Sequence, residues 1–289
     1  YDKLPLQSKY FLRAGYSISA MSGKFHTAWG EFGGFKHPEA LRYEAASMIA
    51  WGATCSFGDQ LHPSGKMDLA TYKNIGHAYT YAKKIEAYGV GGIPSSRLGF
   101  WRSFSESHDE GLAKILLEKQ INFDIANFAK NLNAFDVILI PGSACLDEKT
   151  AARLGRFTDS GGKLIVIGAG AMDRNGGTLL IDIGAKYVGT ANYDRDYLLA
   201  GPKLLTDLIE SPFLNFKPAS RFKPDFGTEI LAHLYEPYFS RTLEHYCSHQ
   251  NTPHRLETSE CPAIIRKGNI IFIASELDWM YLKHGARLH

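Results

Sequence analysis

Short apolar strands alternate with amphipathic helices along this sequence, and this alternation limits the possible folds more than any other feature. The spacing of apolar residues predicts helices over residues 4–14, 38–51 and 68–88, and short strands over residues 16–21 and 53–57. Helices and strands in this order form the repeating unit of parallel α/β proteins. We therefore expect an α/β fold with parallel strands in the first part of the chain.

A second series of elements follows a stretch rich in Gly, Pro and Ser at residues 89–96. Such a composition is typical of a linker, so we expect two domains, residues 1–92 and residues 93–289. In the second domain the pattern predicts strands over residues 97–102, 121–126, 135–140 and 163–167, and helices over residues 109–120 and 147–157. The apolar run at 135–140 is continuous, which indicates burial on both faces. This alternation predicts a doubly wound parallel sheet.

The last third of the chain gives fewer signals. Residues 171–224 show no clear pattern, whereas residues 229–233 resemble a strand. Residues 263–273 resemble a hairpin that turns at Lys267-Gly268-Asn269. We expect both late segments to be strands of a sheet.

Composition excludes several classes of protein. Lys and Arg total 32 against 30 Asp and Glu, with no run of like charges, so we expect no nucleic acid and no membrane as a partner. No run of about 18 apolar residues exists for a membrane helix. The N-terminus has neither an initiator Met nor a signal-peptide pattern. We therefore expect a piece of a longer protein, with the cytoplasm as the favoured compartment.

The four cysteines, Cys55, Cys145, Cys247 and Cys261, have neither CxxC spacing nor the density of a disulfide-rich domain. We expect free thiols, most of them buried. Cys145 allows an alternative, a thiol enzyme, because it follows a predicted strand, as the nucleophile does in amidotransferase-like folds. Asp147 stands where such a turn needs a Gly, which favours an inert, buried Cys145.

Two polar loops follow the first two predicted strands. The first offers His26, Trp29 and Glu31, and the second offers Asp59, Gln60 and His62. In a parallel α/β barrel, the loops at the carboxyl ends of the strands meet at one open mouth. We therefore expect these six residues to reach one pocket, in which carboxylates, hydrogen-bonding groups and an aromatic ring suit a pyranose.

Glycoside hydrolysis needs a pair of carboxylates beside the scissile bond, and Glu31 and Asp59 are the candidates. In the alternative interpretation, each carboxylate only orders its own loop. His26 and His62 suit either structural hydrogen bonds or sugar hydroxyls, and Trp29 suits a stacking platform. The same histidines and carboxylates could bind a metal, but no HxH or HExxH spacing supports this, so we expect none.

No cofactor is expected either. The Gly168-Ala169-Gly170 turn fails the dinucleotide-binding pattern because Asp173 occupies the position of the third glycine.

The two loops, residues 23–34 and residues 58–63, resemble the family called hypothetical glycosyl hydrolase 6, which overlaps the α-L-fucosidases of glycoside hydrolase family 151. Residues 93–289 resemble the β-galactosidase trimerisation domain, a flavodoxin-like or amidotransferase-like module without catalysis of its own. This second resemblance depends on the strand ending at Pro141-Gly142 and on the Gly161-Gly162-Lys163 turn.

The resemblance implies that residues 1–92 are the last two strands of a TIM-type barrel. It implies a carbohydrate substrate, with an α-L-fucoside expected, and a homo-oligomer. Either Glu31 is the nucleophile, or the nucleophile lies on an earlier strand and Glu31 and Asp59 bind substrate. Three hypotheses follow: part of a glycosidase, a noncatalytic assembly module, or a thiol enzyme that uses Cys145.

Overall fold

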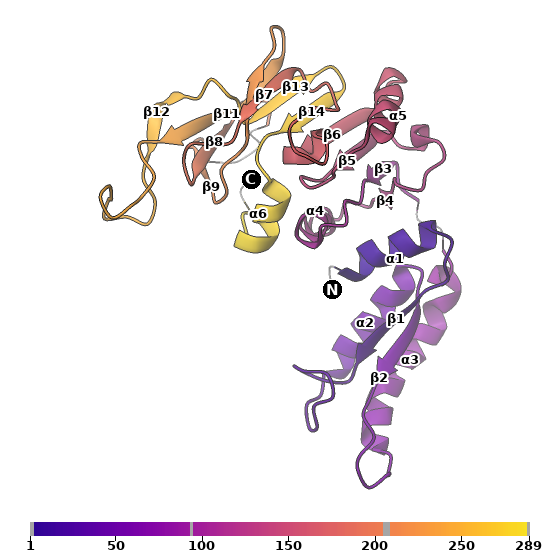
Figure 1. Cartoon of the computed structure of the whole chain (residues 1–289). Helices are drawn as coiled ribbons and strands as arrows, with labels where there is room; N and C mark the ends of the chain where they lie inside the picture. The colour runs from indigo at the N-terminus through magenta and orange to yellow at the C-terminus, as the bar shows by residue number, and fades with distance from the viewer. Residues whose placement is uncertain (1–2, 93–94, 205–208, 288–289) are drawn as a thin grey trace. The chain divides into compact units, whose positions relative to one another are not determined.

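Two compact units, residues Tyr1–Ser95 and Ser96–His289, make up the computed structural model of the chain (Figure 1). The structure describes residues 3–92, 95–204 and 209–287. The predicted domain boundary falls beside residues 93 and 94, which lie outside the described residues.

The first unit contains a two-stranded parallel sheet and three helices. Its elements are α1 (Lys3–Arg13), β1 (Ser19–Gly23), α2 (Pro38–Ala50), β2 (Thr54–Gly58) and α3 (Leu69–Gly89). β1 pairs with β2 in a register that runs from Ser19 opposite Thr54 to Gly23 opposite Gly58. The predicted elements are confirmed, although β1 begins at Ser19 rather than at Tyr16.

Local sequence explains where the helices of the first unit begin. Pro38 stands at the first position of α2. A backbone N–H at this position would have no acceptor within the helix, so proline, which has no N–H, fits there without loss of a hydrogen bond. The carboxylate of Asp68 caps α3 by accepting from the backbone N–H groups of Ala70 and Thr71, at 3.0 and 3.4 Å. Apolar residues of α2 and α3, such as Leu41 and Ala78, then form a shared core.

One face of the two-stranded sheet is open within the described residues. Ala20 is buried against Met48 of α2, whereas its neighbour Met21, on the opposite face of β1, is 66% exposed. Parallel sheets are normally covered on both faces. The exposed side of β1 therefore has the character of a surface that packs against further structure.

The second unit is built around a ten-stranded mixed sheet. Its first half comprises β3 (Leu98–Phe100), α4 (Glu106–Glu118), β4 (Asp124–Ile125), β5 (Val137–Ile140), α5 (Glu148–Asp159) and β6 (Lys163–Ile167), with short 3-10 helices at Leu132–Ala134 and Gly168–Ala171. Its second half comprises β7 (Ala185–Gly189), β8 (Asp196–Ala200), β9 (Phe213–Asn215), β10 (Arg221–Pro224), β11 (Glu229–Pro237), β12 (His254–Thr258), β13 (Ile264–Lys267), β14 (Ile270–Ile273) and α6 (Leu277–His284).

The predicted doubly wound parallel sheet accounts for only half of the strands, because the large sheet of the described residues is mixed. The strand order is β4-β3-β5-β6-β14-β13-β11-β8-β9, and β12 pairs with β11. The part from β4 to β14 is parallel, and the part from β14 to β9 is antiparallel. The two parts meet at the β13–β14 hairpin, whose turn contains Gly268 at φ +54°. The hairpin was predicted, but its role in joining the two parts was not.

The stretch over residues 171–224, which gave no clear pattern, contributes β8 and β9 to the large sheet. β7 and β10 form a separate antiparallel pair. These strands are short and interrupted by turns, so the apolar alternation that marks a strand covers too few residues to be recognised.

Helices pack on the large sheet from both sides. Leu154 and Phe157 of α5 share a core with Ile138 and Leu164, whereas α4 and α6 pack against each other away from α5 (Figure 1). α4 begins at Glu106, earlier than predicted. Among the described residues, no helix has both the length and the apolar character needed to cross a membrane.

A buried charge network connects β8, β10 and β11. Arg221 donates to Asp196 Oδ2 at 2.9 Å and to both carboxylate oxygens of Glu236, at 2.8 and 3.0 Å. Asp196 also accepts from Asn215 at 2.7 Å and from the N–H of Ala219 at 2.9 Å, and it has no exposed surface. Each buried charge therefore has partners of opposite sign or good donors.

A second polar cluster fastens α6 to α4. His108 of α4 lies 3.1 Å from Asp278 Oδ1 through Nδ1 and 3.3 Å from Glu276 Oε2 through Nε2. Lys217 reaches Glu276 at 2.6 Å, and Asp278 accepts from the N–H of Gly142 at 2.8 Å. Burial opposes the charged imidazole, but the two carboxylates outweigh burial and raise the pKa of His108.

We expect Arg221→Met to destabilise the second unit by about 3–5 kcal/mol, because Asp196 would remain buried without its counter-ion. Urea unfolding followed by circular dichroism measures the change. Lys223→Met is the matched control, since Lys223 lies on the same strand in an exposed pair with Glu260 at 3.4 Å. That control should cost less than about 0.5 kcal/mol. Equal losses in both variants would contradict the assigned role of the network.

We expect the stability contributed by His108 to depend on pH. Because its folded pKa is raised, the contribution is complete below the unfolded pKa of about 6.5 and is lost as the pH rises through the folded value. The melting temperature of His108→Gln should therefore lie furthest below that of the original protein in acid, with a difference that narrows as the pH rises. His233→Gln, at an exposed position on β11, serves as the control. A difference that is constant with pH would refute this linkage.

Candidate functional site

The loops that follow β1 and β2, residues 24–37 and 59–68, lie together at the carboxyl ends of the two strands. Gln60 Nε2 donates to the carbonyl of Glu31 at 2.9 Å, and the N–H of Lys24 donates to the carbonyl of Gly58 at 3.1 Å. The structure therefore places the two predicted loops beside each other, as the parallel pairing requires.

The indole of Trp29 lies over the last residues of both strands. A Cβ atom added to Gly58 would stand 2.2 Å from Cη2 of this ring, and one added to Gly23 would stand 3.0 Å from Cζ3. Only glycine at these two paired positions permits the ring to lie so close to the backbone. Phe25 supports the indole edge-on, with ring centroids 5.0 Å apart.

Trp29 is nevertheless 66% exposed. An aromatic ring that is fixed from below and open to solvent offers a flat apolar surface to a ligand. The geometry is thus that of a platform at the strand ends rather than that of a core residue.

The carboxylate of Glu31 is bonded mainly to its own loop. Its Oε1 accepts from the N–H of Thr27 at 2.5 Å, and this bond is the largest of several that lower the pKa of Glu31. Gly34 leaves room for this arrangement, because a Cβ there would stand 2.3 Å from the carboxylate. The lowered pKa of Glu31 favours the ionised carboxylate, which suits an electrostatic or nucleophilic role.

Asp59 and Gln60 hold the second loop. Asp59 Oδ1 accepts from the N–H of Gln60 at 2.8 Å, which is the local role that the alternative interpretation expects. The side chain of Gln60 makes the bond between the two loops, while its Oε1 is buried without a hydrogen-bond partner among the described residues. Gln60 Oε1 can therefore accept a hydrogen bond from a donor that the described residues do not supply.

The two histidines lie on the outside of the loops. His26 is exposed, and its backbone N–H adds to the lowering of the Glu31 pKa. His62 is also exposed, bonds to Ser64 Oγ through Nδ1 at 2.7 Å and packs edge-on against Phe32. His62 therefore has a structural contact at one nitrogen and an open side toward solvent.

Three residues that the sequence pattern did not indicate as functional hold the first loop in place. Lys36 donates to Glu44 Oε1 at 2.9 Å and to Ser22 Oγ at 2.9 Å, and Ser22 donates to Glu44 Oε2 at 2.5 Å. The N–H of Lys36 also donates to the carbonyl of Lys24 at 2.8 Å, so the two ends of the loop are joined. We call Ser22, Lys36 and Glu44 the loop anchor.

One signal in the sequence could have revealed the loop anchor. Glu44 stands three residues after Leu41 and four before Met48, within the apolar stripe of α2, and it is only 6% exposed. A carboxylate in a buried stripe needs a cationic or hydrogen-bonding partner, so its presence there predicts a polar network beneath the loop.

The loops of the second unit at the same end of its parallel strands are occupied by side chains of the chain itself. Asp109 accepts from the N–H groups of Ser103 and Phe104, at 3.0 and 2.9 Å. Asp278 bonds the loop after β5 through Gly142, as described above. Phe104 has a left-handed backbone at φ +67°, which these bonds hold in place. The edge where doubly wound sheets usually bind ligands is thus filled by intramolecular contacts.

The free cysteines differ from expectation in their burial. All four are free thiols, as predicted, but Cys145 is exposed and the other three are half-buried. The expectation of a buried, inert Cys145 is therefore wrong as to burial, although its neighbours Ala144 and Leu146 are buried. Among the described residues, no base contacts its sulfur, and no group of three or more His, Cys, Asp or Glu is arranged to hold a metal.

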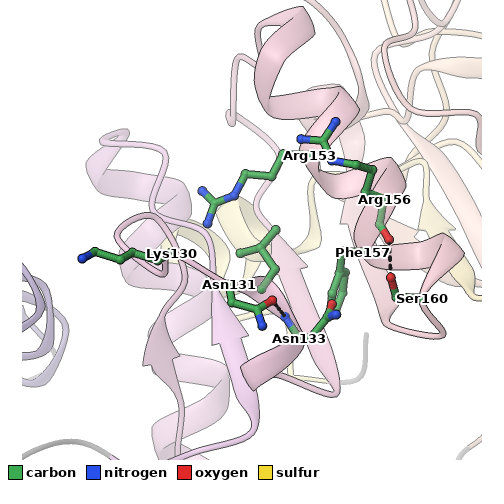
Figure 2. A pocket seen from close by; sticks show the side chains of 8 residues that line it. Lys130, Asn131, Asn133, Arg153, Arg156, Phe157 and Ser160 are labelled. Atoms are coloured by element: carbon green, nitrogen blue, oxygen red, sulfur yellow. Dashed lines mark hydrogen bonds between the residues drawn. The ribbon is translucent and has the colours of Figure 1, made fainter.

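A basic groove of about 230 Å³ lies at the opposite, amino-terminal edge of the second unit's parallel strands (Figure 2). Lys130 points away from the other side chains of this groove, and Asn131 accepts from the N–H of Asn133 at 2.9 Å. Ser160 donates to the carbonyl of Arg156 at 2.8 Å. The polar groups of Asn131 and Ser160 bond to neighbouring residues of the chain, so they do not indicate a ligand site.

Comparisons with known proteins bear on both units. The chain is similar in structure to α-L-fucosidase isoenzyme 2 from Paenibacillus thiaminolyticus, with a TM-score of 0.91 and 31% sequence identity over 100% of this chain and 45% of that one. It is also similar to β-galactosidases from Rahnella sp. R3 (TM-score 0.65, 12% identity, 100% of this chain and 48% of that one) and from Bacillus circulans sp. alkalophilus (0.66, 11%, 98% and 47%).

The chain thus spans less than half the length of these solved structures. No protein-family profile and no curated protein sequence matches it. The two β-galactosidases share the fold alone, while the fucosidase shares sequence as well. The chain is therefore glycoside hydrolase-like, with a mixed α/β fold of the kind found in glycoside hydrolases.

Proposed function

We propose that this chain is the C-terminal part of a glycoside hydrolase that acts on an α-L-fucoside or a related glycoside. The observation that carries the proposal is the exposed ring of Trp29, held over Gly23 and Gly58 where two polar loops meet. Carbohydrate recognition combines an aromatic face with directed hydrogen-bonding groups. The similarity to a bacterial α-L-fucosidase supports the choice of sugar.

The residues of the site take distinct roles in this proposal. Trp29 stacks on the apolar face of the sugar, and the amide of Gln60 and the rings of His26 and His62 bind hydroxyl groups. Glu31, whose pKa is lowered by the N–H of Thr27, remains an anion and either stabilises positive charge at the reacting carbon or attacks it. A general acid, which needs a raised pKa, is assigned to another part of the protein.

The first unit is proposed to be the last two strands of a (β/α)8 barrel, over residues 1–92. The parallel pairing of β1 and β2, with helices on one face only, supports this assignment. The exposed side chain of Met21 on the other face would then point into the barrel, where layers of side chains from all strands fill the interior.

The second unit, over residues 93–289, is proposed to be a flavodoxin-like assembly domain of the β-galactosidase trimerisation type. Its ligand-binding edge is filled by Asp109 and Asp278, which favours assembly over catalysis. The connection between β11 and β12 exposes Leu243 to 99% and Tyr246 to 72%. Large apolar side chains this exposed are typical of an interface, so we propose that the part of this connection around Leu243 and Tyr246 contacts a second copy of the protein.

Removing the functional groups of the site should lower hydrolysis of aryl α-L-fucosides by the full-length protein. We expect Trp29→Ala to raise KM on the order of ten-fold through lost stacking. Glu31→Gln and Asp59→Asn should each lower kcat/KM by about ten-fold or more, because a charged hydrogen bond is lost while shape is kept. Release of nitrophenol measures the rates, and a panel of other aryl glycosides tests the choice of sugar.

Glu39→Gln is the matched control for these carboxylates. Glu39 is an exposed acid of α2 that pairs with Arg42 and His77, at 3.3 and 2.9 Å, outside both loops. Its replacement should leave the rates unchanged. Wild-type rates in all three site variants would remove the loops from the mechanism.

Changing the apolar side chains of the β11–β12 connection should weaken self-association. We expect Leu243→Glu combined with Tyr246→Glu to shift the protein toward smaller species, because charge would be placed in an apolar contact. Light scattering measures the mass. Phe226→Glu, at a fully exposed apolar residue in a different turn, should leave the mass unchanged. A strictly monomeric original protein would refute this part of the proposal.

A further inference from the structure

A small polar pocket of about 200 Å³ lies in the second unit, where β8 begins and β11 ends. Its functional side chains are Asp194, Arg195, Phe239, Arg241, Asn251 and Thr252. We propose that this pocket is a second carbohydrate site, which binds a sugar that carries a carboxylate, of the uronic acid class. The proposal concerns the second unit alone and does not depend on the catalytic role proposed for the first.

Buried polar atoms without partners point to a missing ligand. Thr252 is only 5% exposed, and its Oγ1 has no hydrogen-bond partner among the described residues. Oδ1 of the neighbouring Asn251 is likewise buried and without a partner there. An unsatisfied buried hydroxyl is costly, so folded proteins usually pair such a group with a protein group, an ordered water or a ligand. Both atoms belong to residues that line the pocket.

The two arginines supply positive charge suited to a carboxylate. Arg195 Nε lies 3.8 Å from Asp194 Oδ2, and Arg241 Nη1 donates to the carbonyl of Gln250 at 3.4 Å. Each contact uses one nitrogen of a guanidinium that carries five N–H donors. Two arginines against one aspartate leave the pocket positive, and the planar fork of a guanidinium matches a carboxylate.

The remaining groups suit the rest of a sugar. The Asp194 carboxylate can accept from hydroxyl groups, and the amide of Asn251 can accept and donate. Phe239 is half-buried and packs near His245, with ring centroids 6.2 Å apart, so one part of its ring is available for stacking. A simple inorganic anion would leave these groups unused, whereas a hydroxylated carboxylate carries groups of a matching kind for each of them.

The pocket is held in shape by contacts of its own backbone. The N–H of Asp194 donates to Ser240 Oγ at 3.2 Å, and the N–H of Tyr238 donates to the carbonyl of Pro253 at 3.2 Å. Tyr197 donates through its hydroxyl to the carbonyl of Thr252. Binding therefore requires little ordering of the chain, which favours affinity for a small ligand.

Isothermal titration calorimetry of the whole chain with sodium D-glucuronate tests the proposal, with D-glucose and sodium acetate titrated in parallel. We expect saturable binding of glucuronate, at least about ten-fold tighter than either control, because only glucuronate combines the charge with the hydroxyl groups. Equal binding of acetate would reduce the pocket to an anion site, and equal binding of glucose would remove the role of the arginines. Either result, or no binding of glucuronate, overturns the proposal.

Two variants locate the binding. Thr252→Val keeps the shape of the side chain and removes the hydroxyl, so we expect an unchanged or higher melting temperature with about five-fold weaker binding of glucuronate. Arg241→Gln, at an exposed position, should weaken binding similarly without unfolding the protein. Arg266→Gln is the control, since Arg266 bonds to the carbonyl of Gly268 outside the pocket, at 3.1 Å. Full affinity in both pocket variants would contradict the assignment.

Discussion

The candidate site depends on the parallel pairing that sets Gly23 opposite Gly58 at the ends of β1 and β2. This register brings the two loops to one place and leaves a patch of bare backbone on which the indole of Trp29 lies. Gln60 then connects the loops, and the loop anchor of Ser22, Lys36 and Glu44 fixes the first loop to α2. Shifting the pairing by one residue would put side chains where the ring must be.

In the second unit, a parallel part and an antiparallel part are joined in one sheet. The β13–β14 hairpin pairs with β6 on one side and with β11 on the other, so it belongs to both parts. Next to the parallel part, α6 is held to α4 by the contacts of His108 with Asp278 and Glu276. Carboxylates that could have served a ligand are therefore committed to structure, which fits a domain used for assembly.

Much of the fold could be predicted because strand, helix and cap signals are local. Asp147 caps α5, as expected, and the strand at Lys163–Ile167 has its predicted bounds. The antiparallel half could not be predicted, since its strands pair with segments far away in sequence. For the site, the positions of Trp29 and Glu31 at the strand ends followed from the alternation, but the bond from Glu31 to its own loop depends on Gly34 and Thr27 in three dimensions.

The joined ends of the first loop have an evolutionary consequence. Because the N–H of Lys36 donates to the carbonyl of Lys24 and the side chain of Lys36 is fixed to Glu44, the segment between them is a loop whose two ends are held together. Replacements at exposed positions between these two lysines change the loop surface without disturbing the strand pairing. Under the proposed function, selection at these positions changes which sugar is accepted while the underlying framework stays the same.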